Sequence, residues 1–190
     1  MGQSFAEAED RLYMIDGSRS MNGRLGGGKE SKLGAVRKTL MEFCMENWGA
    51  SYYPWPLRIG VTAYRLLGTP GKTVFEEVIP LNPEPVSLEL WRLEGLGGRG
   101  GAVVRDPLQR GLLILKESPR GKRRLVLIGD GGDSGADPSD VAREIGEAGI
   151  ELLSVELGEE STDSMKNIAR SSGGRYELAR TLDEVRKTII

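Results

Sequence analysis

The sequence predicts one α/β domain, built on a doubly wound, mostly parallel sheet of about six strands with helices on both sides. Short apolar runs typical of buried strands alternate with segments of helical periodicity along most of the chain. Parallel strands need long connections between them, and a helix supplies such a connection. A length of 190 residues fits a single domain. We therefore interpret residues 1–190 as one domain, in which residues 1–10 form an N-terminal extension.

The first half of the chain predicts three strands and one long helix. The first strand is expected at Arg11–Ile15, a short apolar run. A helix is expected from Glu30 to about Glu46, where apolar residues recur every three or four positions and Cys44 falls on the buried face. Alternating patterns predict strands at Leu57–Tyr64 and Thr73–Ile79. Their connection is too short for a parallel crossover, so the second of them is expected to be an antiparallel edge strand.

The second half continues the alternation of helix and strand. Short helices are expected at Ser87–Leu93 and Val104–Leu115. The most strongly apolar strand follows at Arg124–Ile128. The remaining predicted elements are a helix at Ser139–Ala148, a strand at Ile150–Leu157, a helix at Thr162–Ser171, a strand at Arg175–Leu178 and a helix from Leu182 to the end. Helices between apolar strands are the pattern of a parallel sheet.

The composition excludes several kinds of chemistry. The chain has no histidine, which removes Ser-His-Asp and Cys-His catalysis and the helical metalloprotease motif. Its one cysteine removes intramolecular disulfides and four-cysteine zinc sites. Any metal ion must therefore be bound by oxygen ligands.

Charge and hydropathy restrict the partners. The 26 basic and 28 acidic side chains are interspersed, so no broad basic face is expected and no nucleic-acid partner is predicted. The apolar stretches are too short to span a bilayer, and the first residues lack the pattern of a signal peptide. We therefore expect no membrane association and a reduced, cytoplasmic location.

Two of the predicted strands end in aspartate, Asp16 and Asp130. Because the carboxyl ends of parallel strands meet at one edge of a sheet, these carboxylates are expected to lie close together. Alternate side chains after the first strand add two hydroxyls, Ser18 and Ser20. Carboxylates, hydroxyls and water suit a hard octahedral cation such as Mg²⁺ or Mn²⁺. The four residues are candidate metal ligands, although a loop rich in serine and aspartate before a helix is also typical of caps and turns.

This pattern resembles the metal-ion-dependent adhesion site of the von Willebrand factor type A (vWA) domains. That site has the motif Asp-x-Ser-x-Ser, then a threonine in a glycine-rich loop, then an aspartate after an apolar strand. Residues Asp16–Met21 match the first part and Leu125–Gly131 match the last. The order of the predicted elements also agrees with the family from Arg11 to Ile190.

The resemblance implies a protein-binding module rather than an enzyme, with no catalytic residues. Ser18 and Ser20 would bridge Mg²⁺ or Mn²⁺, with Ca²⁺ as an alternative, to an Asp or Glu of a partner protein. Asp16 and Asp130 would orient water molecules bound to the ion. Intracellular members of the family are subunits of larger complexes, including partners of AAA+ ATPases, and the lack of paired cysteines favours this group.

One position departs from the family pattern. Aligning Gly100-Gly101-Ala102 with the family's Gly-Gly-Thr segment places Ala102 where the threonine belongs. The alanine supplies no ligand oxygen, so binding of the ion is expected to be weak or absent. Asp106 and Asp133 are nearby carboxylates that could substitute, but neither is a family position.

Two other functions stay open. Residues 23–29 fit the glycine-and-lysine frame of a phosphate-binding loop, which with Lys29 and Asp130 would make a nucleotide-binding enzyme. Against this, Glu30 stands where that loop needs a serine or threonine hydroxyl. The second alternative is a metal-independent interaction domain in which Ala102 marks a degenerate site.

Overall fold

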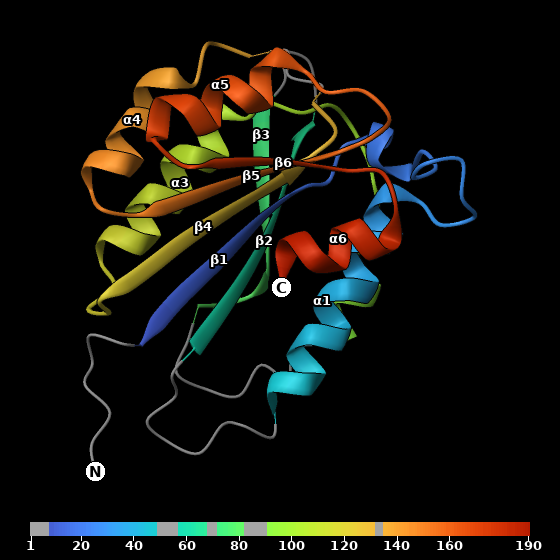
Figure 1. Cartoon of the computed structure of the whole chain (residues 1–190), viewed down its shortest axis with the longest axis horizontal. Coiled ribbons are helices and arrows are strands. Elements are labelled where there is room, and N and C mark those ends of the chain that lie inside the picture. The colour runs from blue at the N-terminus through green and yellow to red at the C-terminus, as the bar shows by residue number, and fades with distance from the viewer. Residues whose placement is uncertain (1–7, 49–56, 68–71, 82–90, 132–134) are drawn as a thin grey trace.

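The computed structural model describes residues 8–48, 57–67, 72–81, 91–131 and 135–190. Six strands form one sheet in the order β3-β2-β1-β4-β5-β6 (Figure 1). Every neighbouring pair is parallel except β2 and β3, which are antiparallel at one edge. The strands are β1 (Glu9–Asp16), β2 (Leu57–Leu67), β3 (Lys72–Ile79), β4 (Lys122–Gly129), β5 (Glu151–Leu157) and β6 (Arg175–Ala179). The predicted fold class is confirmed, including the antiparallel edge strand.

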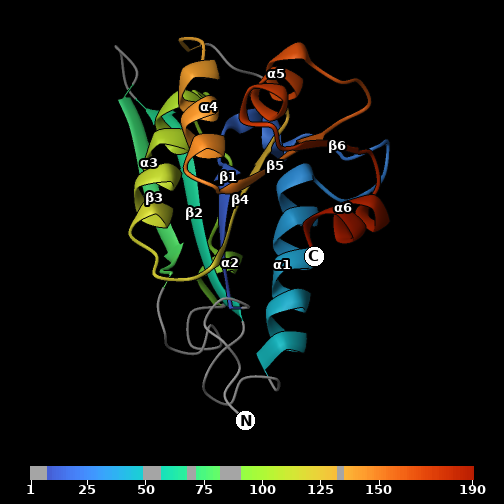
Figure 2. The same cartoon turned by 60° about the vertical axis from the view of Figure 1, so that its left-hand side comes forward.

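Helices cover both faces of this sheet (Figure 2). The helices α1, α2 and α6 pack on one face, and α3, α4 and α5 pack on the other. Their bounds are α1 (Lys32–Trp48), α2 (Trp91–Glu94), α3 (Arg105–Lys116), α4 (Ser139–Glu147), α5 (Asp163–Ser172) and α6 (Leu182–Ile189). None of the described helices is long and apolar enough to cross a membrane.

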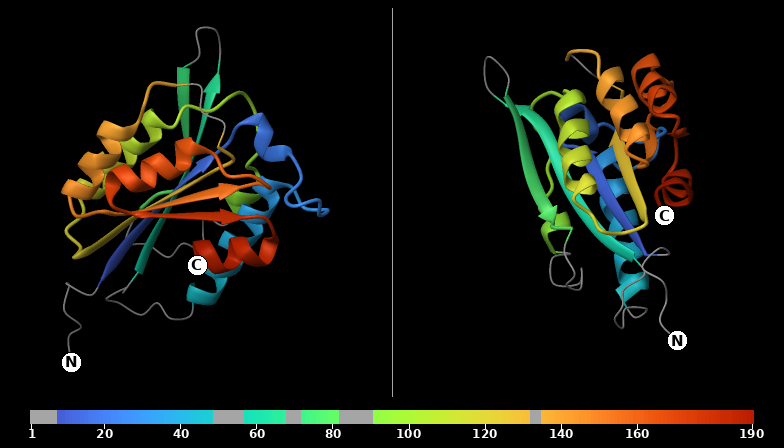
Figure 3. Two further views of the ribbon diagram at one scale, coloured as in Figure 1. Left: turned by 45° about the horizontal axis from the view of Figure 1, so that its top comes forward. Right: turned by 90° about the vertical axis from the view of Figure 1, so that its left-hand side faces the viewer.

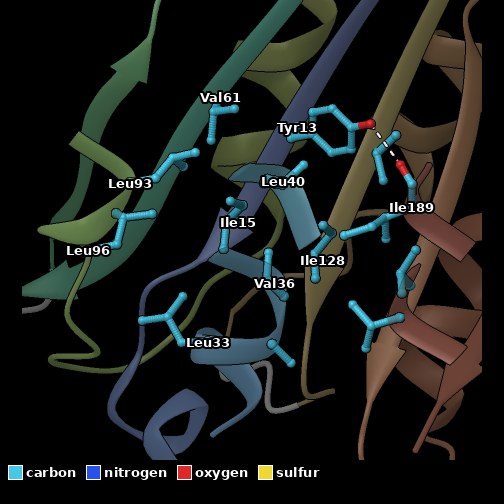
Figure 4. Close-up of a cluster of buried hydrophobic side chains, with 14 of the residues drawn as sticks. Tyr13, Ile15, Leu33, Val36, Leu40, Val61, Leu93, Leu96, Ile128 and Ile189 are labelled. Atoms are coloured by element: carbon cyan, nitrogen blue, oxygen red, sulfur yellow. Dashed lines mark hydrogen bonds between the residues drawn. The ribbon is translucent and has the colours of Figure 1, made fainter. Parts of the chain in front are cut away.

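Alternation along the central strand divides the core into two layers. On β1, Tyr13 and Ile15 face α1 and α6, whereas Leu12 and Met14 face α3 and α4. The first layer is drawn in Figure 4, where the Tyr13 hydroxyl donates to the carbonyl oxygen of Ile189 at 2.7 Å. This bond ties the end of α6 to the middle of the sheet.

Two predicted boundaries at the start of the chain differ from the structure. The strand β1 begins at Glu9, so the expected extension over residues 1–10 is too long by two residues. Asp10 belongs to the strand because Arg58 binds its buried carboxylate with two hydrogen bonds and Arg120 lies 3.2 Å from it. The first helix begins at Lys32 rather than Glu30, because the Ser31 hydroxyl accepts the Gly34 amide at 3.0 Å and so caps the helix there.

The predicted helix over residues 87–93 is described only in part. Residues 87–90 lie outside the described residues, and α2 covers Trp91–Glu94. The later helices and strands agree with their predicted ranges to within one or two residues.

The sheet reverses its strand order at β1. The chain leaves β1 toward α1 on one face and leaves β4 toward α4 on the other. The carboxyl ends of β1 and β4 therefore form the topological switch point, the place where doubly wound sheets bind ligands. In the left view of Figure 3 the loop over residues 17–31 lies at this end of the sheet.

Candidate metal and partner-binding site

Asp16 is the last residue of β1 and its side chain is buried, with 2% of the residue exposed. Its Oδ1 accepts the backbone amide of Ser18 at 2.7 Å. Burial raises the pKa of Asp16 to about 6, and the nearby charge of Asp130 adds to this increase. Hydrogen bonds from Ser18 and the positive charge of Lys32 act in the opposite direction. The carboxylate therefore sits where an added cation would stabilise its ionised form.

The two serines of the motif lie side by side. Their hydroxyl oxygens are 2.9 Å apart, with Ser18 buried and Ser20 exposed. This is a hydrogen-bond distance, and it is close to the separation of about 3.0 Å between two ligands at right angles around an octahedral Mg²⁺ ion, each about 2.1 Å from the ion. The short 3-10 helix Arg19–Asn22 holds this geometry because its Met21 side chain is fully buried in the core.

Asp130 follows β4 and completes the oxygen set. Its side chain is 4% exposed, and Oδ2 accepts a hydrogen bond from the Lys32 ammonium at 3.0 Å. The other oxygen, Oδ1, is buried and receives no hydrogen bond from the described residues. Gly129 brings the end of β4 against Asp16, since a Cβ atom at Gly129 would lie 3.5 Å from that of Asp16. All four predicted ligands thus meet at the switch point.

A glycine-rich segment borders the serine loop. The amide of Arg19 donates to Gly100 O at 3.0 Å, and the amide of Arg99 donates to Gly17 O at 2.7 Å. Close approach requires glycine, because a Cβ atom at Gly98 would lie 2.6 Å from the carbonyl oxygen of Ser18. The segment is thus fixed to the serine loop by backbone hydrogen bonds on the rim of the site.

The other sequence candidates have different positions. Ala102 is buried in the apolar cluster that includes Met14 and Leu127, and its methyl group offers no oxygen. The Asp106 carboxylate accepts a hydrogen bond from Thr73 on β3. Asp133 lies outside the described residues.

The side chains present fit a divalent cation in most respects. Two carboxylates and two hydroxyls form an oxygen-only set, which suits Mg²⁺ or Mn²⁺. Within the described ranges no three Asp, Glu or Cys side chains gather to hold a metal, so a cation at this position would also need oxygen atoms from the serines. The exception to the fit is Lys32, whose ammonium already neutralises Asp130. Lys32 was not identified from the sequence, because the predicted helix begins at Glu30 and Lys32 therefore does not stand out as a cation at a helix N-terminus.

The glycine loop before α1 differs from a phosphate-binding loop. The amide of Leu25 donates to Glu30 O at 3.0 Å, and that of Gly28 donates to Leu25 O at 2.9 Å. These amides are therefore used inside the loop rather than directed at a ligand. Lys29 is exposed, and Asp130 pairs with Lys32 instead.

The parallel sheet with one antiparallel edge strand and helices on both faces is a fold that solved vWA domains also have. Solved structures support this assignment. The vWA domain of SpRpn10 superposes with a TM-score of 0.72 at 14% identity, over 96% of this chain and 94% of that one.

In two further solved structures, the match with this chain covers only part of the other protein. The PilB minor pilin from Streptococcus sanguinis has a TM-score of 0.75 at 12% identity, over 96% of this chain and 59% of the pilin. A vWA protein from Catenulispora acidiphila has a TM-score of 0.71 at 17% identity, over 95% and 40% of the two chains. No family model and no curated protein matches the sequence. At such identities the similarity establishes the fold.

Proposed function

We propose that this chain is a protein-interaction module that binds a partner's Asp or Glu through Mg²⁺ or Mn²⁺. Ser18 and Ser20 hold the ion, and Asp16 and Asp130 stabilise its charge and orient its water molecules. The partner belongs to a larger intracellular complex, of which a AAA+ ATPase is one class implied by the resemblance to vWA domains. Ca²⁺ is an alternative ion.

One observation carries this proposal. The Ser18 and Ser20 hydroxyls are hydrogen-bonded to each other at 2.9 Å at the switch point. They lie beside the buried Asp16 and an Asp130 oxygen that receives no hydrogen bond from the described residues. A site with so few direct carboxylates leaves much of the positive charge of the ion unneutralised. Such an ion attracts an additional anionic ligand from outside the chain.

The rim around these residues favours an acidic partner. Arg19 and Arg99 are exposed on adjacent segments that backbone hydrogen bonds hold together. Neither guanidinium forms an ion pair with the described residues. Their charges are therefore free to attract acidic residues that flank the metal-bound carboxylate.

A binding role agrees better with the chemistry of the chain than catalysis does. The single cysteine, Cys44, is buried in the core, and burial raises the pKa of its thiol to about 12. The thiol therefore stays protonated and unreactive near neutral pH. With no histidine in the chain, the serine hydroxyls lack the usual general base.

Titration calorimetry with Mg²⁺, Mn²⁺ and Ca²⁺ tests the metal site. The wild-type chain is expected to bind Mg²⁺ or Mn²⁺, and the double variant Ser18→Ala/Ser20→Ala is expected to lose that binding. A matched control is Ser164→Ala/Ser171→Ala on α5, which removes two hydroxyls from another part of the fold. Equal isotherms for the wild type and the Ser18/Ser20 variant would rule out the site.

A fluorescent glutamate-rich peptide tests the acidic partner. The fluorescence anisotropy of the peptide is expected to rise when the protein is added with Mn²⁺ and to fall back when a chelator is added. The Arg19→Gln/Arg99→Gln variant is expected to bind the peptide more weakly. Charge-reversed lysine-rich peptide is the control. Equal binding with and without the ion would instead support the metal-independent interaction domain, which the buried Ala102 and the Lys32–Asp130 pair favour.

A further inference from the structure

We propose that Lys32 is an internal counter-ion of the site, and that its ammonium group competes with the divalent cation for Asp130. The inference rests on the proposed function and adds a residue outside the Asp-x-Ser-x-Ser motif that sets the affinity of the site. It also defines two states, one neutralised by lysine and one by metal.

The contact itself is the first support. The Lys32 ammonium lies 3.0 Å from Asp130 Oδ2, and the two side chains are 17% and 4% exposed. A carboxylate this deeply buried needs a compensating positive charge. Lys32 supplies that charge without a metal, whereas the second oxygen of Asp130 has no hydrogen bond from the described residues.

The position of Lys32 on its helix is the second support. It is the first residue of α1, directly after the capping Ser31. A positive side chain at a helix N-terminus is electrostatically unfavourable, because the backbone amides there carry partial positive charge. The attraction of Asp130 accounts for a lysine at this position, so the pair is an ordered contact rather than a solvated charge.

The competition follows from charge. A divalent ion held by Ser18 and Ser20 and stabilised by Asp130 would lie close to the Lys32 ammonium group. The positive charges of the ion and of the ammonium group would repel each other. A unit charge within about 4–6 Å changes the proton affinity of a carboxyl by about 10- to 1000-fold. Removing the lysine charge is therefore expected to strengthen metal binding by at least about tenfold.

The experiment is a titration of the full chain with Mn²⁺, in which electron paramagnetic resonance measures the concentration of the free ion. Lys32→Met removes the charge and keeps most of the side-chain length. Lys32→Arg keeps the charge. Lys38→Met removes an exposed lysine from the same helix and controls for the change in net charge. We expect Lys32→Met to bind Mn²⁺ at least about tenfold more tightly, and the other two variants to stay near the wild-type affinity.

The outcomes separate this inference from the proposed function. If the wild type binds Mn²⁺ and Lys32→Met binds it no more tightly, the competition is wrong and the metal-binding function stands. If only Lys32→Met binds the ion, the competition holds and the wild-type site is closed by lysine. If neither binds it, both proposals fail.

Thermal unfolding gives a second readout, because a variant with a damaged fold would also bind poorly. With a chelator present, Lys32→Met is expected to melt at a lower temperature than the wild type, since Asp130 loses its counter-charge. Saturating Mn²⁺ is expected to restore the melting temperature of Lys32→Met more than it raises that of Lys38→Met. Equal Mn²⁺ effects on these two variants would contradict the inference.

Discussion

The Lys32 ammonium lies 3.0 Å from Oδ2 of Asp130, across 98 positions of sequence. This ion pair joins the first turn of α1 to the residue that follows β4. The electrostatics of the switch point therefore depend on a helix as well as on the strand ends. Four predictions test how the site and the surrounding fold use such contacts.

Asp130→Asn is expected to weaken Mn²⁺ binding by about 10- to 100-fold, as is usual when a residue supporting a metal site is changed. The amide keeps the shape of the carboxylate but loses its charge. Calorimetry measures the change, with Asp106→Asn as control because Asp106 bonds to Thr73 on β3. A larger loss in Asp106→Asn than in Asp130→Asn would mean that the wrong carboxylate has been assigned.

Ala102→Thr is expected to strengthen metal binding, on the order of tenfold, because the added hydroxyl supplies the oxygen that the vWA pattern has there. Ala102 is buried, so any larger side chain also strains the apolar cluster. Ala102→Val has the same shape as threonine without the hydroxyl and is the matched control. Equal affinities for the threonine and valine variants would show that this position does not face the ion.

Asp10→Asn is expected to lower the free energy of unfolding by about 3–5 kcal/mol, because it removes the buried carboxylate charge that faces the guanidinium groups of Arg58 and Arg120. Urea unfolding measures the loss. The control is Glu144→Gln in the exposed pair with Lys116, where about 0.5 kcal/mol is expected. Similar losses at the two sites would contradict the structural role given to Asp10.

Because Tyr13 is buried, we expect the fold to lose stability at high pH. Burial raises its pKa to about 12, so the folded chain holds the phenol proton more tightly than the unfolded chain, whose tyrosines ionise near pH 10. The resulting stabilisation is fully present below about pH 10 and is lost as the pH rises through about 12. Urea unfolding is measured across this pH range. The free energy of unfolding of the wild type is expected to fall by up to about 3 kcal/mol more than that of Tyr13→Phe. Parallel pH profiles for the two proteins would disprove the assignment.

Much of the fold follows from local pattern. The apolar runs of β1 and β4 identify them as central strands, because buried parallel strands expose neither face to water. The boundaries at the start of the chain differ because side chains distant in sequence decide them. Asp10 joins β1 through contacts with Arg58 and Arg120, which no local window contains.

The candidate site could also be predicted only in part from the sequence. Spacing alone selects Asp16, Ser18, Ser20 and Asp130, since strand ends of a parallel sheet converge on one edge. The backbone clamp between Arg19 and Gly100 and the exclusion of side chains at Gly98 depend on the packing of segments about 80 residues apart.

The sequence by itself determined the α/β class, the parallel pairing that follows from helical crossovers, the one antiparallel edge strand, and the oxygen-only character of any metal site. Tertiary structure alone decided which charge faces Asp130. A sequence pattern specifies which side chains lie near a strand end, but electrostatic partners are chosen by distance in space. Here the folding of α1 against the sheet brings Lys32 to the carboxylate.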